Sequence, residues 1–204
     1  MIDFRRIQKK LSVVLCITSI FSLSEAAESN FKWRIPLGLT HASYFSEIND
    51  ATQRKLEEET YGYVESTESL PIALFCAPYV EHMPTGLGFG AEIGPLSMVL
   101  GDGSYTNLPL GLNARYYPLR GNTSPYLKLG LRKNMVSGDV IEGDSIGFCG
   151  AVGVEFNRQG AVGYGLEVGI DKSEIEITHG DNWESGQEND ILDGGVTFSL
   201  FVVF

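Results

Sequence analysis

Large apolar side chains alternate with small or polar ones along most of the chain, and helical periodicity is nearly absent. In residues 33–40, for example, Trp33, Ile35, Leu37 and Leu39 share one face. The same period of two recurs over 87–94, 108–117, 126–132, 146–156, 162–171 and 195–204, and a less regular stretch covers 70–81. Short alternating segments separated by turn residues are typical of β-strands. The sequence therefore predicts an all-β fold with eight strands.

The face opposite the large apolar side chains is rich in glycine and carries one or two charged residues per strand. A soluble sandwich turns its polar face to water, but glycine is poorly suited to an exposed strand surface. Small residues beside a few long ones suit the crowded interior of a narrow barrel. We therefore predict an eight-stranded antiparallel up-and-down transmembrane β-barrel, whose apolar face contacts lipid and whose small, polar face lines the lumen.

The charged residues of the inner face are the candidate functional site. The predicted lumen charge network comprises Arg34, Glu92, Arg115, Lys128, Arg132, Glu155 and Glu167, with Glu81 as a further candidate. Such a set could line a small ion-selective pore. Alternatively, it closes the lumen, because eight strands leave a space just wide enough for side chains and buried charges persist when they are paired. We expect the closed, ion-paired lumen.

The connections between the predicted strands differ in length on the two sides of the barrel. Three long connections fall on one side, at 46–69, 137–145 and 178–190, together with a tight turn at 101–104. Three short connections fall on the other side, at 82–85, 119–124 and 157–160. Outer-membrane barrels carry their long loops outside the cell, so both termini are expected in the periplasm. Outward aromatic residues gather near the short turns, as in an interfacial girdle: Trp33, Tyr116, Phe156, Tyr164 and Phe204.

The first 26 residues have the pattern of a secretory signal peptide. Four basic residues precede an apolar stretch at 11–23, and Ser24-Glu25-Ala26 follows with small residues at the cleavage positions. We expect a signal peptide at 1–26 and a barrel domain at 27–204. The whole chain has a net charge of −11, and removing the first 26 residues, which carry +2, leaves −13. Since this charge repels polyphosphate, nucleic acid is not expected as a partner.

The final strand and three internal segments carry a resemblance to a known family. The chain ends in a strand, 195–204, with apolar residues at alternate positions and a terminal aromatic, Phe204; segments 108–117, 124–131 and 150–156 add to it. These segments resemble the small eight-stranded outer-membrane β-barrels of the OmpA-like/OmpW-like family. The resemblance implies a monomer in outer-membrane lipid whose C-terminal assembly signal, Phe198, Leu200, Val202 and Phe204, is read by the barrel assembly machinery. A peptidoglycan-binding domain is not expected.

The sequence favours a non-enzymatic outer-membrane protein with a structural or surface-interaction role, without cofactor, metal site or catalytic residues. A small porin-like channel is the alternative, and a soluble ligand-binding barrel is a further one. A lipid-modifying enzyme is less favoured: His41 and Ser43 share one face, but Tyr44 replaces the asparagine expected in a His-x-Ser-Asn motif. Cys76 and Cys149 are predicted on opposite walls of the barrel, too far apart for a disulfide.

Overall fold

A computed structural model describes residues 30–43, 45–48, 50, 53, 72–99, 105–138, 141–179 and 190–204. The predicted signal peptide, 1–26, lies outside these residues, as does most of the chain between 44 and 71 and between 180 and 189. Among the described residues, no helix is long and apolar enough to cross a membrane. The unit Phe31–Phe204 holds all the described strands.

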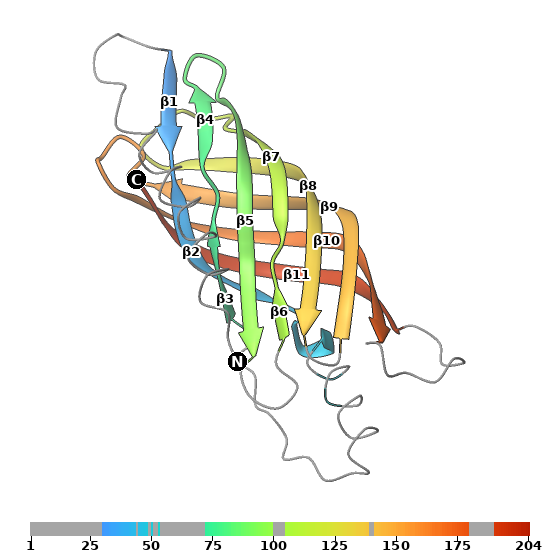
Figure 1. Cartoon of the computed structure of the whole chain (residues 1–204). Helices are drawn as coiled ribbons and strands as arrows, with labels where there is room; N and C mark the ends of the chain where they lie inside the picture. Colours follow the sequence, from blue (N-terminus) through green and yellow to red (C-terminus); the bar gives the residue numbers. More distant parts are fainter. Residues whose placement is uncertain are drawn as a thin grey trace, which may run out of the picture. The chain divides into compact units, whose positions relative to one another are not determined.

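Eleven strand segments make up this unit: β1 (Phe31–Arg34), β2 (Pro36–Ala42), β3 (Ile72–Cys76), β4 (Tyr79–His82), β5 (Leu87–Val99), β6 (Tyr105–Asn107), β7 (Leu110–Tyr116), β8 (Ser124–Gly138), β9 (Ile141–Phe156), β10 (Gly163–His179) and β11 (Asp190–Val203). Three pairs, β1/β2, β3/β4 and β6/β7, each continue one another, so eight strands result. Every pairing is antiparallel, and β11 returns to pair with β2. The predicted eight-stranded barrel is therefore confirmed, and it is closed (Figure 1).

The three breaks within predicted strands coincide with prolines. Pro36 follows the break between β1 and β2, Pro78 lies between β3 and β4, and Pro109 lies between β6 and β7. Proline has no N–H to donate to a strand ladder, so it interrupts regular pairing. Each pair of segments nevertheless stays in one wall, since β1 pairs with β4 while β2 pairs with β3.

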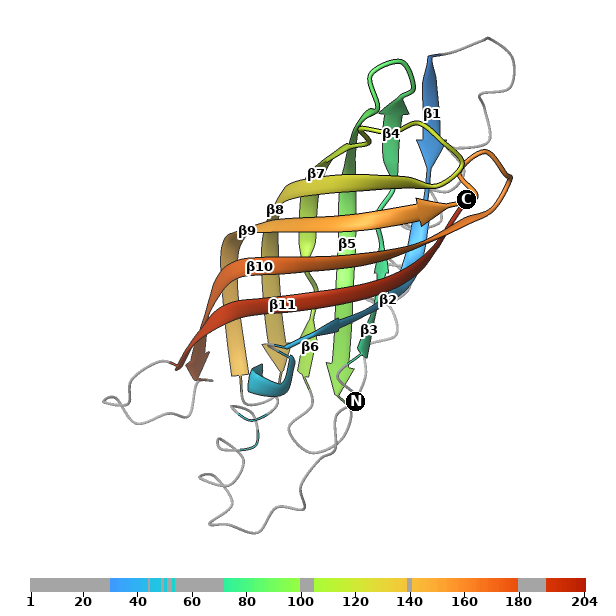
Figure 2. The same ribbon diagram turned by 180° about the vertical axis from the view of Figure 1, so that it is seen from behind.

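Side chains alternate between the two faces as predicted. On β8, Tyr126, Lys128 and Arg132 are buried inside the barrel, whereas Leu127 and Leu129 are exposed outside it. Many large apolar side chains among the described residues are exposed, most of them on the outward face of the strands, with 36% to 76% of their surface accessible. Figure 2 shows β8 to β11 side by side in the wall that carries many of them. The molecule thus exposes its large apolar residues and buries its charges.

The connections mark two ends of the barrel. The turns at residues 83–86, 117–123 and 157–162 lie at one end, here termed the turn end; the opposite end is the loop end. Gly86 closes the first turn with φ of 70°, a conformation that L side chains rarely adopt, and its N–H donates to the carbonyl of His82.

One predicted connection is wrong. Residues 137–145 were expected to form a long loop, but β8 continues to Gly138 and β9 begins at Ile141, with Ser137 opposite Glu142. The strands here extend past the apolar part of the wall and carry polar residues on both faces. Alternation of hydrophobicity, on which the expectation depended, is lost in such a segment.

Candidate functional site

Among the described residues, ten charged side chains are buried in the interior of the barrel, five basic and five acidic. They are Arg34, Arg115, Lys128, Arg132 and Arg158, with Glu81, Glu92, Glu155, Glu167 and Asp171, and each is at most 6% exposed. All seven residues of the predicted network are among them, and so is the further candidate Glu81. The described interior is therefore electrically neutral, as the cost of burying isolated charges requires.

The first group of charges lies at the turn end and is termed the turn-end cluster: Arg34, Glu81, Glu155 and Arg158. Arg34 donates from Nε to Glu81 at 3.0 Å and from Nη1 to Glu155 at 2.9 Å. Arg158 donates from Nη2 to Glu81 at 2.6 Å. Arg158 Nε also lies 3.6 Å from Glu155. Two cations and two carboxylates thus form a closed square of contacts across strands β1, β4 and β9 and the turn after β9.

Arg158 was not part of the predicted network, because its position in a turn gave no sign that its side chain folds into the barrel. Its guanidinium lies over the ring of Tyr117, 3.8 Å from the ring centre. Burial by itself lowers the pKa of Arg158, but the hydrogen bonds and charge of Glu81 outweigh burial, so the pKa is raised above its ordinary value. The charged guanidinium of Arg158 is thus buried inside the turn end of the barrel.

The second group, the central cluster, consists of Glu92, Lys128, Arg132, Glu167 and Asp171. Lys128 Nζ lies 3.1 Å from Glu92 and 2.6 Å from Glu167. Arg132 pairs with Glu92 and also with Asp171, the latter at 2.6 Å. These contacts form a chain of alternating charge from β10 through β8 and β5 and back to β10.

Asp171 was missing from the predicted network although its position in the alternation of 163–171 places it on the inner face. It also accepts a hydrogen bond from the backbone N–H of Ser173 at 3.1 Å, next to a register shift between Asp171 and Glu174. The alternation was therefore sufficient to identify this residue, whereas its pairing with Arg132 depends on the barrel closing.

Arg115 joins the two clusters without an ion pair of its own within the described residues. Its guanidinium lies 4.6 Å from the ring centre of Tyr79 and 5.3 Å from that of Tyr126. Its Nε and Nη1 atoms have no hydrogen-bond partner. The central cluster has one more acid than base, so the charge of Arg115 completes the balance, and the faces of the two rings stabilise the cation.

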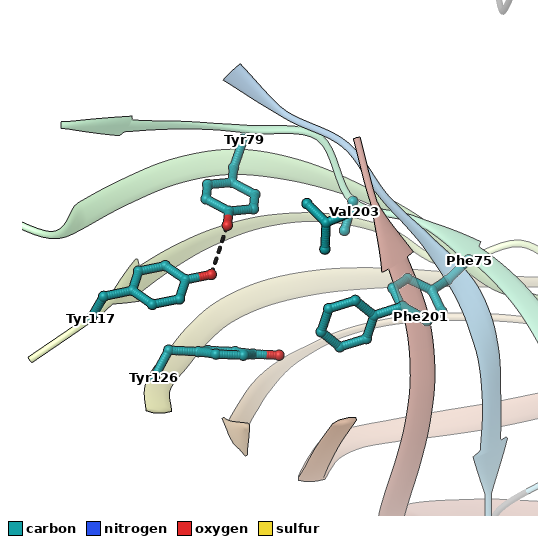
Figure 3. Close-up of a cluster of buried hydrophobic side chains, with 7 residues drawn as sticks. Phe75, Tyr79, Tyr117, Tyr126, Phe201 and Val203 are labelled. Atoms are coloured by element: carbon teal, nitrogen blue, oxygen red, sulfur yellow. Dashed lines mark hydrogen bonds between the residues drawn. The ribbon is translucent and has the colours of Figure 1, made fainter. Parts of the chain in front are cut away.

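Three tyrosines connect these charges to an apolar layer. The hydroxyls of Tyr79 and Tyr117 are 2.6 Å apart, and Tyr117 donates to Glu155 at 2.8 Å. Tyr126 donates to Glu167 at 2.6 Å. Figure 3 shows these rings beside Phe75, Phe201 and Val203, which with Ala77 complete the apolar cluster inside the barrel. Aromatic rings and ion pairs together fill the section between the two charged clusters.

Little space is left in this part of the lumen. A cavity of about 10 Å³ lies among residues that include Glu92, Lys128, Cys149 and Glu167. This is close to the smallest volume that holds one water molecule. Towards the loop end two neutral side chains, Asn107 and Asn134, are buried, and their amides have no hydrogen-bond partner among the described residues.

The residues of the predicted C-terminal assembly signal all lie on the outer face. Phe198, Leu200 and Val202 are exposed on β11, and Phe204 follows the strand. The backbone of Phe204 exchanges hydrogen bonds of 3.0 and 3.2 Å with Ile35, which ties the end of the chain to the first strand. The aromatic residues of the predicted girdle lie towards the turn end, where the rings of Phe156 and Tyr164 stack with centres 5.3 Å apart. Other outward aromatic residues, such as Phe148 and Phe198, lie further along the wall.

The other sequence-predicted candidates are not brought together into a reactive site. His41 and Ser43 lie on the exposed outer face, and Ser43 Oγ accepts a hydrogen bond from the backbone N–H of Val196. Cys76 and Cys149 are free thiols, as expected, one on the outer face and one inside. No cluster of potential metal ligands occurs in the part of the chain that the structure describes.

Comparisons with known proteins give similarity to solved structures but no match at the level of sequence. No protein-family model matches the sequence, and no curated protein matches it either. Among solved structures, the fold is similar to the crystal structure of Neisserial surface protein A, with a TM-score of 0.44 and 14% sequence identity. The similarity covers 86% of this chain and 96% of that chain. The fold described above rests on the strand pairing within this chain.

Proposed function

We propose that the protein is an integral outer-membrane β-barrel with a structural or surface-interaction role, a closed lumen and no enzymatic activity. The observation that carries the proposal is the inverted distribution of side chains. Large apolar residues on all eight strands face outward, while ten charged residues are paired or balanced inside. In water this arrangement would expose a continuous apolar surface, whereas in a bilayer it satisfies both faces.

The closed lumen follows from the two charged clusters and the layer between them. Carboxylates and bases from different strands meet at 2.6–3.1 Å inside the barrel, and the tyrosine rings and Arg115 fill the section between the two clusters. Opening a path for ions would require breaking several buried ion pairs at once. Removing a partner from a single buried pair costs about 3–5 kcal/mol.

The proposed role as a surface protein rests on where the acidic residues of the chain lie. Since the described interior is balanced, the net negative charge of the chain comes from its other parts, and the sequence has many acidic residues in the connections at the loop end. Connecting segments on a rigid scaffold are where binding specificity usually resides. Orientation with the turn end in the periplasm places these segments outside the cell.

Heat-modifiable migration tests the proposal. The protein is extracted from isolated outer membranes with detergent, and boiled and unboiled samples are compared by gel electrophoresis. A closed membrane barrel is expected to resist SDS until it is heated, so the unboiled protein migrates separately from the boiled one. Recovery of the native protein in the soluble periplasmic fraction without detergent would refute the membrane location.

A further inference from the structure

A hollow lies on the outer face of the barrel. It has a volume of about 450 Å³ and lies over β8, β9 and β10, with Leu127, Leu129, Val152, Val168 and Ile170 around it and Gly150 within it. Gly150 stands opposite Leu129 on one side and Ile170 on the other. At this level of the outer face, two branched aliphatic side chains therefore flank a position that has no side chain.

Backbone packing does not require glycine at this position. A Cβ atom on Gly150 would lie 3.5 Å from Leu129 Cδ2 and 3.8 Å from the carbonyl oxygen of Lys128, which are ordinary contacts. The inward Gly153 on the same strand differs, because a Cβ there would come within 2.5 Å of the Tyr126 ring. The inner glycine makes room for a neighbour, whereas Gly150 leaves space open on the outer surface.

A cation stands directly beyond the hollow on the loop-end side. Lys172 is the next outward residue after Ile170 on β10 and lies opposite Phe148. Successive outward residues on a strand are about 7 Å apart, so the four-carbon stem of Lys172 is long enough to reach the rim of the hollow. Lys172 is exposed and has no ion pair among the described residues, whereas the nearby Lys133 is paired with Asp144 at 2.7 Å.

We propose that the hollow and Lys172 form a docking site for a phosphate-bearing membrane lipid, with one acyl chain lying over Gly150 and the phosphate on the Lys172 ammonium. The inference rests on the proposed membrane function. The apolar lining selects a hydrocarbon chain, and the unpaired cation at its rim selects an anionic headgroup. A lysine at this height can extend its ammonium to the polar border of the bilayer while its stem covers apolar surface.

Lipid titration of the purified full chain tests the site. The barrel is folded in a non-ionic detergent, and bound lipid is counted by native mass spectrometry with phosphatidylglycerol or with phosphatidylcholine of the same acyl chains. The unaltered protein is expected to retain phosphatidylglycerol in preference. Gly150→Leu fills the hollow and is expected to weaken retention of both lipids by about tenfold, the equivalent of roughly 1.4 kcal/mol.

Lys172→Gln tests the headgroup contact separately, and it does not alter the hollow. It is expected to reduce the preference for phosphatidylglycerol by about threefold to fivefold, because an exposed ion pair contributes up to about 1 kcal/mol. Retention of phosphatidylcholine is expected to stay unchanged. The matched controls are Lys133→Gln, at a cation already paired, and Ala91→Leu, an outward residue on β5; both are expected to bind lipid like the unaltered protein.

The outcomes separate this proposal from the membrane assignment. Equal retention by Gly150→Leu, Lys172→Gln and the unaltered protein would overturn the site, and so would equal losses in the two controls. A dimer that is lost in Gly150→Leu would assign the hollow to a second copy of the chain instead. Each variant is first checked for heat-modifiable migration; absence of that behaviour in the unaltered protein would refute the proposed function rather than the lipid site.

Discussion

Glu155→Gln perturbs the turn-end cluster at its most connected carboxylate. Glu155 is fully buried, lies 2.9 Å from Arg34 Nη1, and accepts hydrogen bonds from the hydroxyls of Tyr117 at 2.8 Å and Tyr79 at 3.2 Å. Glutamine keeps the size of the side chain but removes its charge. Arg34 and Arg158 then face a single carboxylate, and the cluster acquires a net positive charge inside the barrel.

The expected loss of stability follows from that uncompensated charge. Removing one partner of a buried pair costs about 3–5 kcal/mol, and the side-chain oxygen of glutamine can still accept from the tyrosine hydroxyls, so we expect a loss of about 3 kcal/mol. The loss corresponds to a change of about a hundredfold in the folding equilibrium. The assay is the fraction of heat-modifiable protein across a urea titration of the barrel in lipid vesicles.

An exposed ion pair provides the control. Asp144→Asn breaks the contact between Asp144 and Lys133. Because the two side chains are 67% and 47% exposed, the substitution is expected to reduce stability by about 0–1 kcal/mol. The double variant Arg34→Met with Glu155→Gln restores neutrality, so its loss is expected to be smaller than the sum of the single losses. If Glu155→Gln costs no more than Asp144→Asn, the reasoning about buried charge balance is refuted.

Two further predictions concern the two faces of the wall. Gly153→Ala places a methyl group 2.5 Å from the Tyr126 ring and is expected to lower the midpoint of urea unfolding. Gly150→Ala, on the outer face of the same strand, is expected to leave the midpoint nearly unchanged. Equal midpoints for the two variants would contradict the assigned faces. Cys149 is buried inside the barrel, and Cys76 is half-buried on its outer face. An alkylating reagent added in detergent is therefore expected to label Cys76 faster, which mass spectrometry of the labelled peptides measures. Faster labelling of Cys149 would contradict the closed interior.

The facing of side chains could be predicted from the sequence because a strand has a strict period of two. Once Trp33, Leu129 or Phe198 is assigned to the outer face, its neighbours are assigned to the inner face by geometry alone. The seven residues of the predicted charge network were found in this way, and all are buried in the barrel. The assignment needed no knowledge of which strands are neighbours.

The pairing of charges needed information that alternation does not contain. Glu155 meets Arg34 only because β11 closes on β2 and brings distant walls together, and Arg158 enters the lumen through a turn rather than a strand. The strand ends near 138 and 141 were also missed, since polar residues occupy both faces there. Sequence patterns therefore predicted the faces, and tertiary closure determined the contacts.

Ion conductance of the barrel in planar lipid bilayers tests the central claim most directly, because the claim is that paired charges close the lumen. Protein verified by heat-modifiable migration is reconstituted, and its current is compared with that of protein-free bilayers under the same voltage. The structure predicts no current steps above the protein-free control. Stable, reproducible steps from the folded barrel would show an open path past the turn-end and central clusters and would contradict the account.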